Sequence, residues 1–537
     1  MSETQTNVDA GAGLGRAVRT VSGLTLVSRV MGLARDLATV RIFGDTAVGS
    51  AFAAAFAIPN MFRRLFGEGA LSAAFLPEYA RLDENEPESA GAFARLTLIM
   101  LALVTGAISV VIELGVLAAV LLSPADADRD LSLHLIMVMI PYMPLICIAA
   151  IMGGMLQTHE RFGVWAAAPI ILNVFVIGAC APFWVVEGAT PAGWAYVIGV
   201  AAVAAGAVQV AWSWAALKGR VRWGAASSDS WRRVRAMLVR MVPVLIGLGT
   251  LQLNTLVDTL IAMWPVWVGP QVAGRAYPLD EASNAVLYYA QRLYQFPLGV
   301  FGVAVATAVF PALSRASDDE GRFLDTLRKG VRLSVFIALP ASVGLALVRE
   351  DLVGALYSGL GDGFSAGGVA RAGWVVLGYS VGVWAYSLNQ IWTRAFYARG
   401  DTGTPMRIAV AMVGLNLVLN LVLIWRLREA GLAWGTSIAA IVQCVLLGIA
   451  ARRKLGVRAD VDVRTSVMRT VLMAGAMGAF VGGLLLLWPG VESWGARAAR
   501  LAVATVGGAG VFGVLALVLR APELSWLLHP GAARPRA

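Results

Sequence analysis

Long apolar runs dominate this chain and limit what it can fold into. Of its 537 residues, 58% are hydrophobic and only 14% are charged, whereas soluble domains contain about 25% charged residues. A helix needs about 20 mostly apolar residues to cross a bilayer. The runs are continuous rather than alternating, which favours spanning helices over a transmembrane barrel. The sequence therefore predicts an all-α, polytopic membrane protein.

Fourteen runs are long enough to be spans, so we predict fourteen transmembrane helices. The second is the weakest, because charged residues and glycine interrupt it. The polar N-terminus leads into a long first span, and no cleavable signal peptide is predicted. The predicted spans are 18–42, 47–78, 93–123, 132–156, 163–186, 191–217, 236–266, 284–313, 331–349, 369–394, 406–426, 430–451, 466–488 and 497–519.

Basic residues predict the orientation of these spans. With the N-terminus inside, the predicted inner segments contain 27 lysines and arginines and the outer segments contain nine. Cytoplasmic loops of membrane proteins carry this excess of basic residues, so both termini are expected in the cytoplasm. A net charge of +10 is also typical of nucleic-acid binding. Because the basic residues lie in short loops between apolar runs, we exclude nucleic acid as a partner.

The longest strongly basic inner segment, 218–240, divides the chain. The spacing Ala-x-x-Pro-x-x-x-Arg ends the second span of each half, and glycine and proline inside these spans predict kinked helices. Two half-bundles around a central cavity are a common transporter plan. We predict an N-terminal lobe over 1–217, a basic cytoplasmic linker over 218–240, a C-terminal lobe over 241–455, and a terminal helix pair with a tail over 456–537.

Several arginines lie inside runs that are otherwise apolar enough to cross a bilayer. On insertion scales each costs about 2.5–3.5 kcal/mol at the centre of a spanning helix, so such residues usually face a watery cavity or a partner. Guanidinium groups suit phosphate or pyrophosphate, which they bind through paired hydrogen bonds. The alternative is that they form interhelical salt bridges only. The predicted cationic cavity contains Arg29, Arg35, Arg63 and Arg292.

Polar neighbours of these arginines belong to the same candidate site. Asp36 lies seven residues after Arg29, which places the two on one helix face. Asn60, Arg64 and Glu68 recur at four-residue spacing, so Arg64 and Glu68 could instead form an intrahelical ion pair. We assign Asn60 and Glu68 to the substrate-binding set, and Asp36 and Arg64 as gating candidates.

A second polar group lies in later spans and consists of Asp258, Asn416, Asn420 and Thr436. Oxygen ligands of this kind can hold a sodium ion, and interhelical hydrogen bonding is the alternative. We expect no other cofactor. The sequence contains no spaced metal or acid–base set, no phosphate-cradling glycine loop and no nucleophile elbow. An enzyme is therefore not predicted.

Four segments together point to a known family. With these segments the sequence resembles, over nearly its whole length, the MurJ (MviN) lipid II flippases of the MATE-like (MOP) exporter superfamily. The segments are Ser28-Arg29-Val30-x-Gly32-x-x-Arg35-Asp36, Ala51-Phe52-x-x-Ala55-Phe56-x-x-Pro59-Asn60-x-x-Arg63-Arg64-x-x-x-Glu68-Gly69-Ala70, Tyr289-Ala290-x-Arg292-Leu293-x-x-Phe296-Pro297-x-Gly299-Val300-x-Gly302-Val303-Ala304, and Phe396-Tyr397-Ala398-Arg399-x-Asp401-Thr402-x-Thr404-Pro405.

The resemblance implies fourteen helices, in two six-helix lobes and a final pair. It also implies export, by alternating access, of undecaprenyl-pyrophosphate-linked disaccharide pentapeptide (lipid II), the peptidoglycan precursor, across the bacterial inner membrane. The family's cavity arginines match Arg29, Arg35, Arg63 and Arg292. Its sodium positions match Asp258, Asn416, Asn420 and Thr436. Spans 466–488 and 497–519 correspond to the pair that forms a groove for the lipid tail.

Two positions depart from the family pattern. Asn420 stands where the family has an acid, which weakens the sodium prediction. Ser50 stands where the family often has an aspartate, so a gate that pairs that acid with a cavity arginine is expected to be absent, or rebuilt with Asp45.

Lipid II and membrane lipids are thus the expected partners, together with cell-wall synthesis proteins as candidates. A flippase for another polyprenyl-pyrophosphate-linked glycan stays open as an alternative. A MATE-like ion-coupled exporter of cationic drugs would need acids where this chain has arginines. An integral-membrane glycosyltransferase would need a carboxylate or metal site on an interfacial loop, which we do not find. A scaffold would not explain arginines inside apolar runs.

Overall fold

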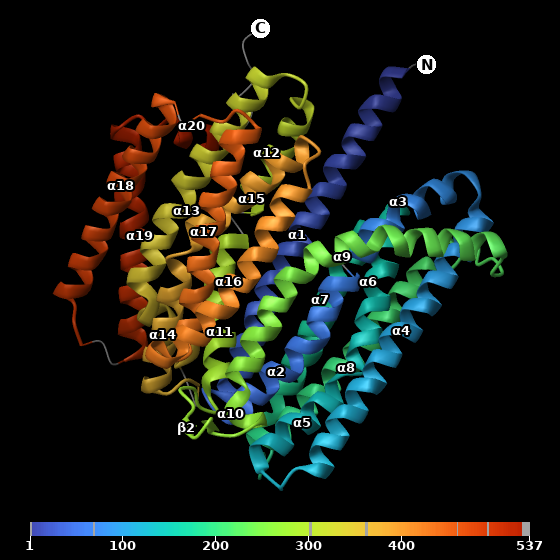
Figure 1. Cartoon of the computed structure of the whole chain (residues 1–537), viewed down its shortest axis with the longest axis horizontal. Coiled ribbons are helices and arrows are strands. Elements are labelled where there is room, and N and C mark those ends of the chain that lie inside the picture. The colour runs from blue at the N-terminus through green and yellow to red at the C-terminus, as the bar shows by residue number, and fades with distance from the viewer. Residues whose placement is uncertain are drawn as a thin grey trace. The chain divides into compact units, whose positions relative to one another are not determined.

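The computed structural model describes residues 3–67, 70–299, 303–359, 363–458, 460–490 and 493–528. These residues are almost entirely helical (Figure 1). Among them the one sheet is a short antiparallel hairpin, in which β1 (Gln271–Val272) pairs with β2 (Arg275–Ala276). The chain divides into two compact units, Met1–Gly269 and Pro270–Ala537.

An apolar core in unit 1 is built mainly from α3, α4, α6 and α9. Phe75, Tyr79 and Phe93 are fully buried in that core, and the ring of Phe75 stacks on each of the other two with ring centroids 5.3 Å apart. Its helices are α1 (Glu3–Phe43), α2 (Ala47–Phe62), the π-helical turn η1 (Arg63–Gly67), α3 (Ala70–Asn85), α4 (Pro87–Leu122), α5 (Ala127–Met139), α6 (Tyr142–Thr158), α7 (Phe162–Cys180), η2 (Ala181–Trp184), α8 (Pro191–Leu217), α9 (Ser228–Ala262) and α10 (Trp264–Trp267).

Unit 2 is organised around one long helix, α13, which packs against α12, α14, α15, α18 and α19. A second close pair is formed by α16 and α17. The helices of this unit are α11 (Ser283–Pro297), α12 (Val303–Arg315), α13 (Glu320–Tyr357), α14 (Ala366–Ser380), α15 (Val383–Ala398), α16 (Gly403–Leu427), α17 (Ala430–Lys454), α18 (Val461–Leu487), α19 (Trp494–Val518) and α20 (Pro522–Leu528).

Side-chain caps fix where many of these helices begin. Each of the caps accepts a hydrogen bond from a backbone N–H in the first turn, and such a cap stabilises a helix by about 1 kcal/mol. Proline follows the cap in α8, where a missing N–H costs nothing. The capping residues are Thr46, Asp126, Thr190, Ser227, Asp319, Ser365, Asp460 and Ser493.

The described residues contain nine helical segments that are long and apolar enough to cross a membrane. They are Pro87–Leu122, Ala127–Thr158, Phe162–Trp184, Pro191–Leu217, Glu320–Tyr357, Gly403–Leu427, Ala430–Lys454, Val461–Leu487 and Trp494–Val518. This confirms the all-α, polytopic membrane class. The other five predicted spans lie on α1, α2–α3, α9, α11–α12 and α14–α15, so the number fourteen stays a prediction.

Several predicted spans are each divided into two helices, and two of these spans contain a predicted cavity arginine. Span 47–78 consists of α2, the π-helical turn and α3, which continues to Asn85. Span 284–313 consists of α11, which ends at Pro297, and α12, which begins at Val303. We call these the interrupted helices of units 1 and 2, because π-helical residues, 63–67 and 298–299, follow α2 and α11. The boundary between the units follows α10, whereas the predicted linker 218–240 ends within α9. The predicted lobes and terminal pair stay a prediction.

Candidate functional site

Two of the predicted arginines lie on α1. The side chain of Arg35 donates to Asp36 Oδ1 from Nη2 at 2.7 Å and from Nε at 3.1 Å, and its guanidinium lies 5.0 Å from the centre of the Phe56 ring. Both members of this ion pair are largely buried. Arg29 is exposed two turns earlier. Adjacent residues on a helix usually diverge, so spacing alone did not predict that Asp36 pairs with Arg35.

Arg63 begins the π-helical turn of unit 1. Pro59, inside α2, has no backbone N–H to donate to the helix. The Asn60 amide donates to the Phe56 carbonyl at 2.9 Å and accepts from Arg63 Nε at 3.4 Å. Arg64 is exposed beside it, and Glu68 lies outside the described residues. Single π turns in helices are frequent at functional sites, and this one holds Arg63 against Asn60.

Arg292 lies on α11, ahead of the interruption in unit 2. Its Nη2 donates to the Tyr288 hydroxyl at 2.8 Å, and its guanidinium lies 4.6 Å from the centre of the same ring. The next face of α11 is also aromatic, because Tyr294 stacks on Tyr379 with centroids 4.3 Å apart. The sequence analysis missed these tyrosines, although their repetition along one amphipathic helix was a usable signal.

Three residues of the predicted sodium site lie in contact with one another in unit 2. Asn416 and Asn420, both buried on α16, exchange hydrogen bonds of 3.5 and 3.2 Å between their amides. Asn416 also donates to Thr436 Oγ1 of α17 at 3.3 Å. Asp258 is buried on α9 in unit 1. In unit 2 the two amides bond to each other within α16, and Asn416 links α16 to α17. A bound sodium ion stays a prediction.

An ion-pair network that the sequence analysis missed holds the start of α11. Asp280 accepts from Arg371 Nη2 and from Arg428 Nη2, both at 2.7 Å, and Arg371 Nε donates to Glu429 at 2.6 Å. Glu429 is only 3% exposed. Burial would raise the pKa of Asp280, but the hydrogen bond and charge of Arg371, with help from Arg428, outweigh it and lower that pKa. We call these four residues the α11 anchor.

Similar solved structures define the class of the fold. "Lipid II flippase MurJ, inward closed conformation" matches with a TM-score of 0.75 at 20% identity, over 96% of this chain and 99% of that one. An inward-facing multidrug resistance MATE family transporter of the MOP superfamily matches with a TM-score of 0.64 at 13% identity, over 81% of this chain and 98% of that one. This chain therefore shares its fold with these two membrane transporters.

Sequence similarity narrows this class to one family. The family model "Lipid II flippase MurJ" matches residues 39–494. The probable lipid II flippase MurJ of Vibrio cholerae is 31% identical over 93% of this chain and 94% of the relative. The corresponding protein of Rhizobium tropici is 31% identical over 87% of this chain and 85% of the relative. The chain belongs to the lipid II flippase MurJ family, which confirms the predicted resemblance.

Proposed function

We propose that this protein moves lipid II from the inner to the outer leaflet of the bacterial cytoplasmic membrane. The match to the MurJ family over residues 39–494 carries this proposal. The substrate has a charged headgroup and a long apolar tail. Moving pyrophosphate and sugars unaided through about 30 Å of hydrocarbon is prohibitive, so a protein must supply a polar route.

Arginines provide the chemistry for the headgroup. Arg29, Arg35, Arg63 and Arg292 neutralise the diphosphate through paired, charge-assisted hydrogen bonds. Arg63 and Arg292 each contact a polar side chain one turn earlier, Asn60 and Tyr288, and these contacts help to orient the guanidinium groups. Arg35 shares its charge with Asp36, so the substrate phosphate competes with that carboxylate. This exchange gives Asp36 its proposed part in gating.

The lipid tail stays in the hydrocarbon during transfer, along α18 and α19. Both helices are long and apolar and expose large aliphatic side chains, among them Leu486 and Val506. The headgroup crosses by alternating access, with both termini in the cytoplasm as the distribution of basic residues predicts. The protein acts as a transporter and makes or breaks no covalent bond. Cell-wall synthesis enzymes are the proposed source and destination of its substrate.

Complementation tests this function directly. The native chain is expressed in a bacterial strain depleted of its own lipid II flippase, and purified protein is assayed for lipid II transfer in vesicles. We expect the native chain to restore growth and transfer, and Arg63→Ala and Arg292→Ala to lose both. Arg95→Ala is the matched control, because Arg95 is an exposed arginine of α4 outside the site.

Two outcomes would reject parts of this proposal. Normal transfer by Arg63→Ala and Arg292→Ala would remove the assigned role of the arginines. A folded native chain that fails with lipid II, but transfers another polyprenyl-pyrophosphate-linked glycan in the same vesicles, would replace the substrate. That second function rests on the same chemistry, because the arginines recognise the diphosphate that both lipids share.

A further inference from the structure

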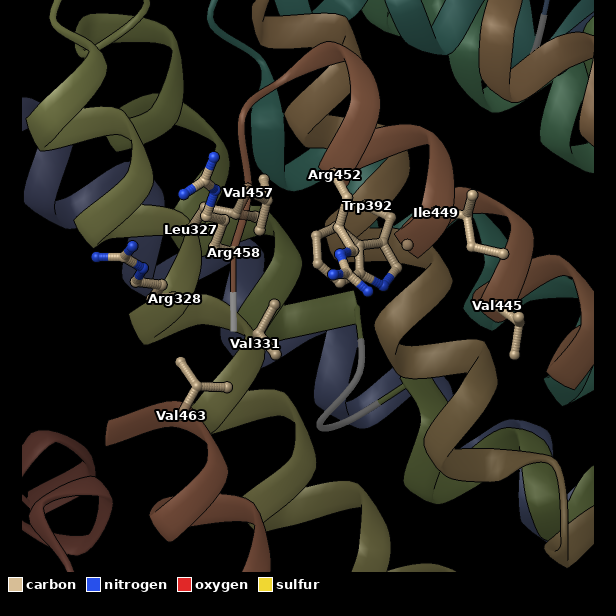
Figure 2. Close-up of a pocket in the computed structure, with 11 residues that line it drawn as sticks. Leu327, Arg328, Val331, Trp392, Val445, Ile449, Arg452, Val457, Arg458 and Val463 are labelled. Carbon is tan, nitrogen blue, oxygen red and sulfur yellow. The ribbon is translucent and has the colours of Figure 1, made fainter. Parts of the chain in front are cut away.

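A groove at one end of unit 2 contains none of the arginines assigned to lipid II (Figure 2). It encloses about 270 Å³ between α13, α15, the last turns of α17 and the first turn of α18. It lies where α17 ends at Lys454 and the chain turns back into α18 at Val461. The ends of spanning helices meet the headgroup layer of a bilayer. The groove is therefore placed at the boundary between hydrocarbon and headgroups.

The wall of the groove is apolar. Val445 and Ile449 of α17 are 54% and 41% exposed, so this side of the wall is accessible from outside the unit. Trp392 forms another part of the wall, and tryptophan is enriched at membrane interfaces because one end of the ring is apolar and the other is polar. The apolar lining residues are Leu327, Val331, Trp392, Val445, Gly448, Ile449, Val457 and Val463.

Three arginines complete the lining: Arg328, Arg452 and Arg458 (Figure 2). Arg328 Nε lies 3.1 Å from Asp460 Oδ2, so a carboxylate already balances its charge. Arg452 and Arg458 are exposed, and among the described residues neither takes part in an ion pair. The groove thus combines an apolar wall with two positive charges that the described part of the chain does not neutralise.

This combination identifies the class of ligand. A free phosphate needs the arginines but not the apolar wall, and a neutral lipid needs the wall but not the arginines. A phospholipid with a negative headgroup uses both, because basic residues near a membrane surface attract anionic lipids. We propose that the groove binds an anionic glycerophospholipid, with one acyl chain against Trp392 and Gly448 and the headgroup phosphate on Arg452 and Arg458. The groove shares only Val463, in the first turn of α18, with the helix pair assigned to the lipid II tail.

Gly448 allows a direct test of the apolar wall. A Cβ added at this position meets no atom within 4 Å, so a larger side chain can begin there, and Gly448 lines the groove that this side chain would enter. Leucine also favours a helix more than glycine does, so Gly448→Leu is expected to fold. Gly414→Leu is the matched control, because Gly414 of α16 is equally open and does not line the groove.

The measurement is the thermal unfolding midpoint of the purified full-length chain in a nonionic detergent, with added phosphatidylglycerol or phosphatidylcholine. We expect phosphatidylglycerol to raise the midpoint of the native chain and of Gly414→Leu, because a ligand that binds only the folded state stabilises it. Gly448→Leu should show no such shift. Phosphatidylcholine should have little effect on any of the three proteins.

The arginines are tested by titrating phosphatidylglycerol against the double variant R452Q/R458Q. Each basic residue near an anionic surface contributes about a factor of five, so the pair should weaken binding about 25-fold. R407Q/R453Q removes the same number of charges from exposed positions that do not line the groove, and it should keep the native affinity within about twofold.

Three results would overturn the proposal. In the first, phosphatidylglycerol raises the unfolding midpoint of Gly448→Leu as much as that of the native chain. In the second, phosphatidylcholine raises the midpoint of the native chain as much as phosphatidylglycerol does. In the third, the two double variants lose the same amount of affinity for phosphatidylglycerol. Undecaprenyl phosphate is added as a separate arm. If it stabilises the protein through Gly448 and the two arginines while phosphatidylglycerol does not, the groove holds a polyprenyl lipid and the proposal is wrong. None of these readouts depends on transport of lipid II.

Discussion

The interrupted helices of the two units each contain a predicted cavity arginine. They differ in where polar side-chain contacts hold them to the rest of their unit. In unit 1 the anchor lies after the interruption, where the buried Tyr79 hydroxyl is 2.9 Å from His159 Nε2, and His159 Nδ1 is 3.5 Å from Asp83. In unit 2 the α11 anchor lies before the interruption, at Asp280. The position of the anchor along an interrupted helix is therefore independent of the position of the arginine.

The arginines themselves differ in their local support. Arg63 lies within the π-helical turn, and the amide of Asn60 supports it. Arg292 lies in regular helix, ahead of the terminal Pro297, and the ring and hydroxyl of Tyr288 support it. Both supports are neutral groups one turn earlier on the same helix. The two units therefore reach the same arrangement, a guanidinium held by a neutral neighbour, with different residues.

The largest expected effect tests whether these two arginines are equivalent. Lysine keeps the positive charge but cannot make the paired hydrogen bonds of a guanidinium. Charge-assisted hydrogen bonds contribute about 1.5–3 kcal/mol, so Arg63→Lys and Arg292→Lys should each slow lipid II transfer in vesicles by about tenfold or more. Arg95→Lys should transfer at the native rate. A loss in only one of the two variants would show that the arginines have unlike roles.

The next effect concerns the α11 anchor. Glu429→Gln removes the negative charge that Arg371 Nε contacts at 2.6 Å, in a place where Glu429 is 3% exposed. Breaking a buried pair costs about 3–5 kcal/mol, and since Asp280 still compensates part of the charge we expect about 3 kcal/mol. Denaturant unfolding in detergent measures this loss. Glu350→Gln, at an exposed acid beside Arg349, should change stability by about 0.5 kcal/mol or less.

A smaller loss is expected from the anchor of unit 1. Tyr79→Phe removes one hydrogen bond with His159, which costs about 1–2 kcal/mol when the remaining partner is buried. Tyr196→Phe is the control, because Tyr196 is half-buried and no hydrogen bond involves its hydroxyl among the described residues. The same unfolding assay applies. A loss as large as that of Glu429→Gln would contradict our expectation that the ion pairs of the α11 anchor stabilise the protein more than the hydrogen bond between Tyr79 and His159 does.

The sequence predicted the membrane class, the family and the places where two spans are interrupted. Apolar runs, prolines and glycines act locally along the chain, so they can be read without coordinates. The partners of charged side chains could not be read in this way. Asp36 pairs with its neighbour Arg35, although spacing favoured Arg29, and Asp280 meets Arg371 and Arg428 from distant parts of the chain. Such contacts depend on how helices pack, which one sequence does not determine.

The smallest expected effect is the pH dependence of the α11 anchor. The folded-state pKa of Asp280 is lowered, so its charge stabilises the fold above the unfolded-state pKa of about 3.9. That contribution is lost as the pH falls from about 4 through the lowered folded-state pKa. Asp280→Asn should therefore be less stable than the native chain at pH 7, and the difference should shrink below about pH 4.

Asp280 is 43% exposed, so water screens its interactions and the effect should be smaller than that of Glu429→Gln. Unfolding of both proteins at pH 7, 5, 4 and 3 measures the difference, and Asp325→Asn, at an exposed acid paired with Lys329, controls for general acid effects. A constant gap between Asp280→Asn and the native chain down to pH 3 would mean that the aspartate acts through its shape and hydrogen bonds rather than its charge.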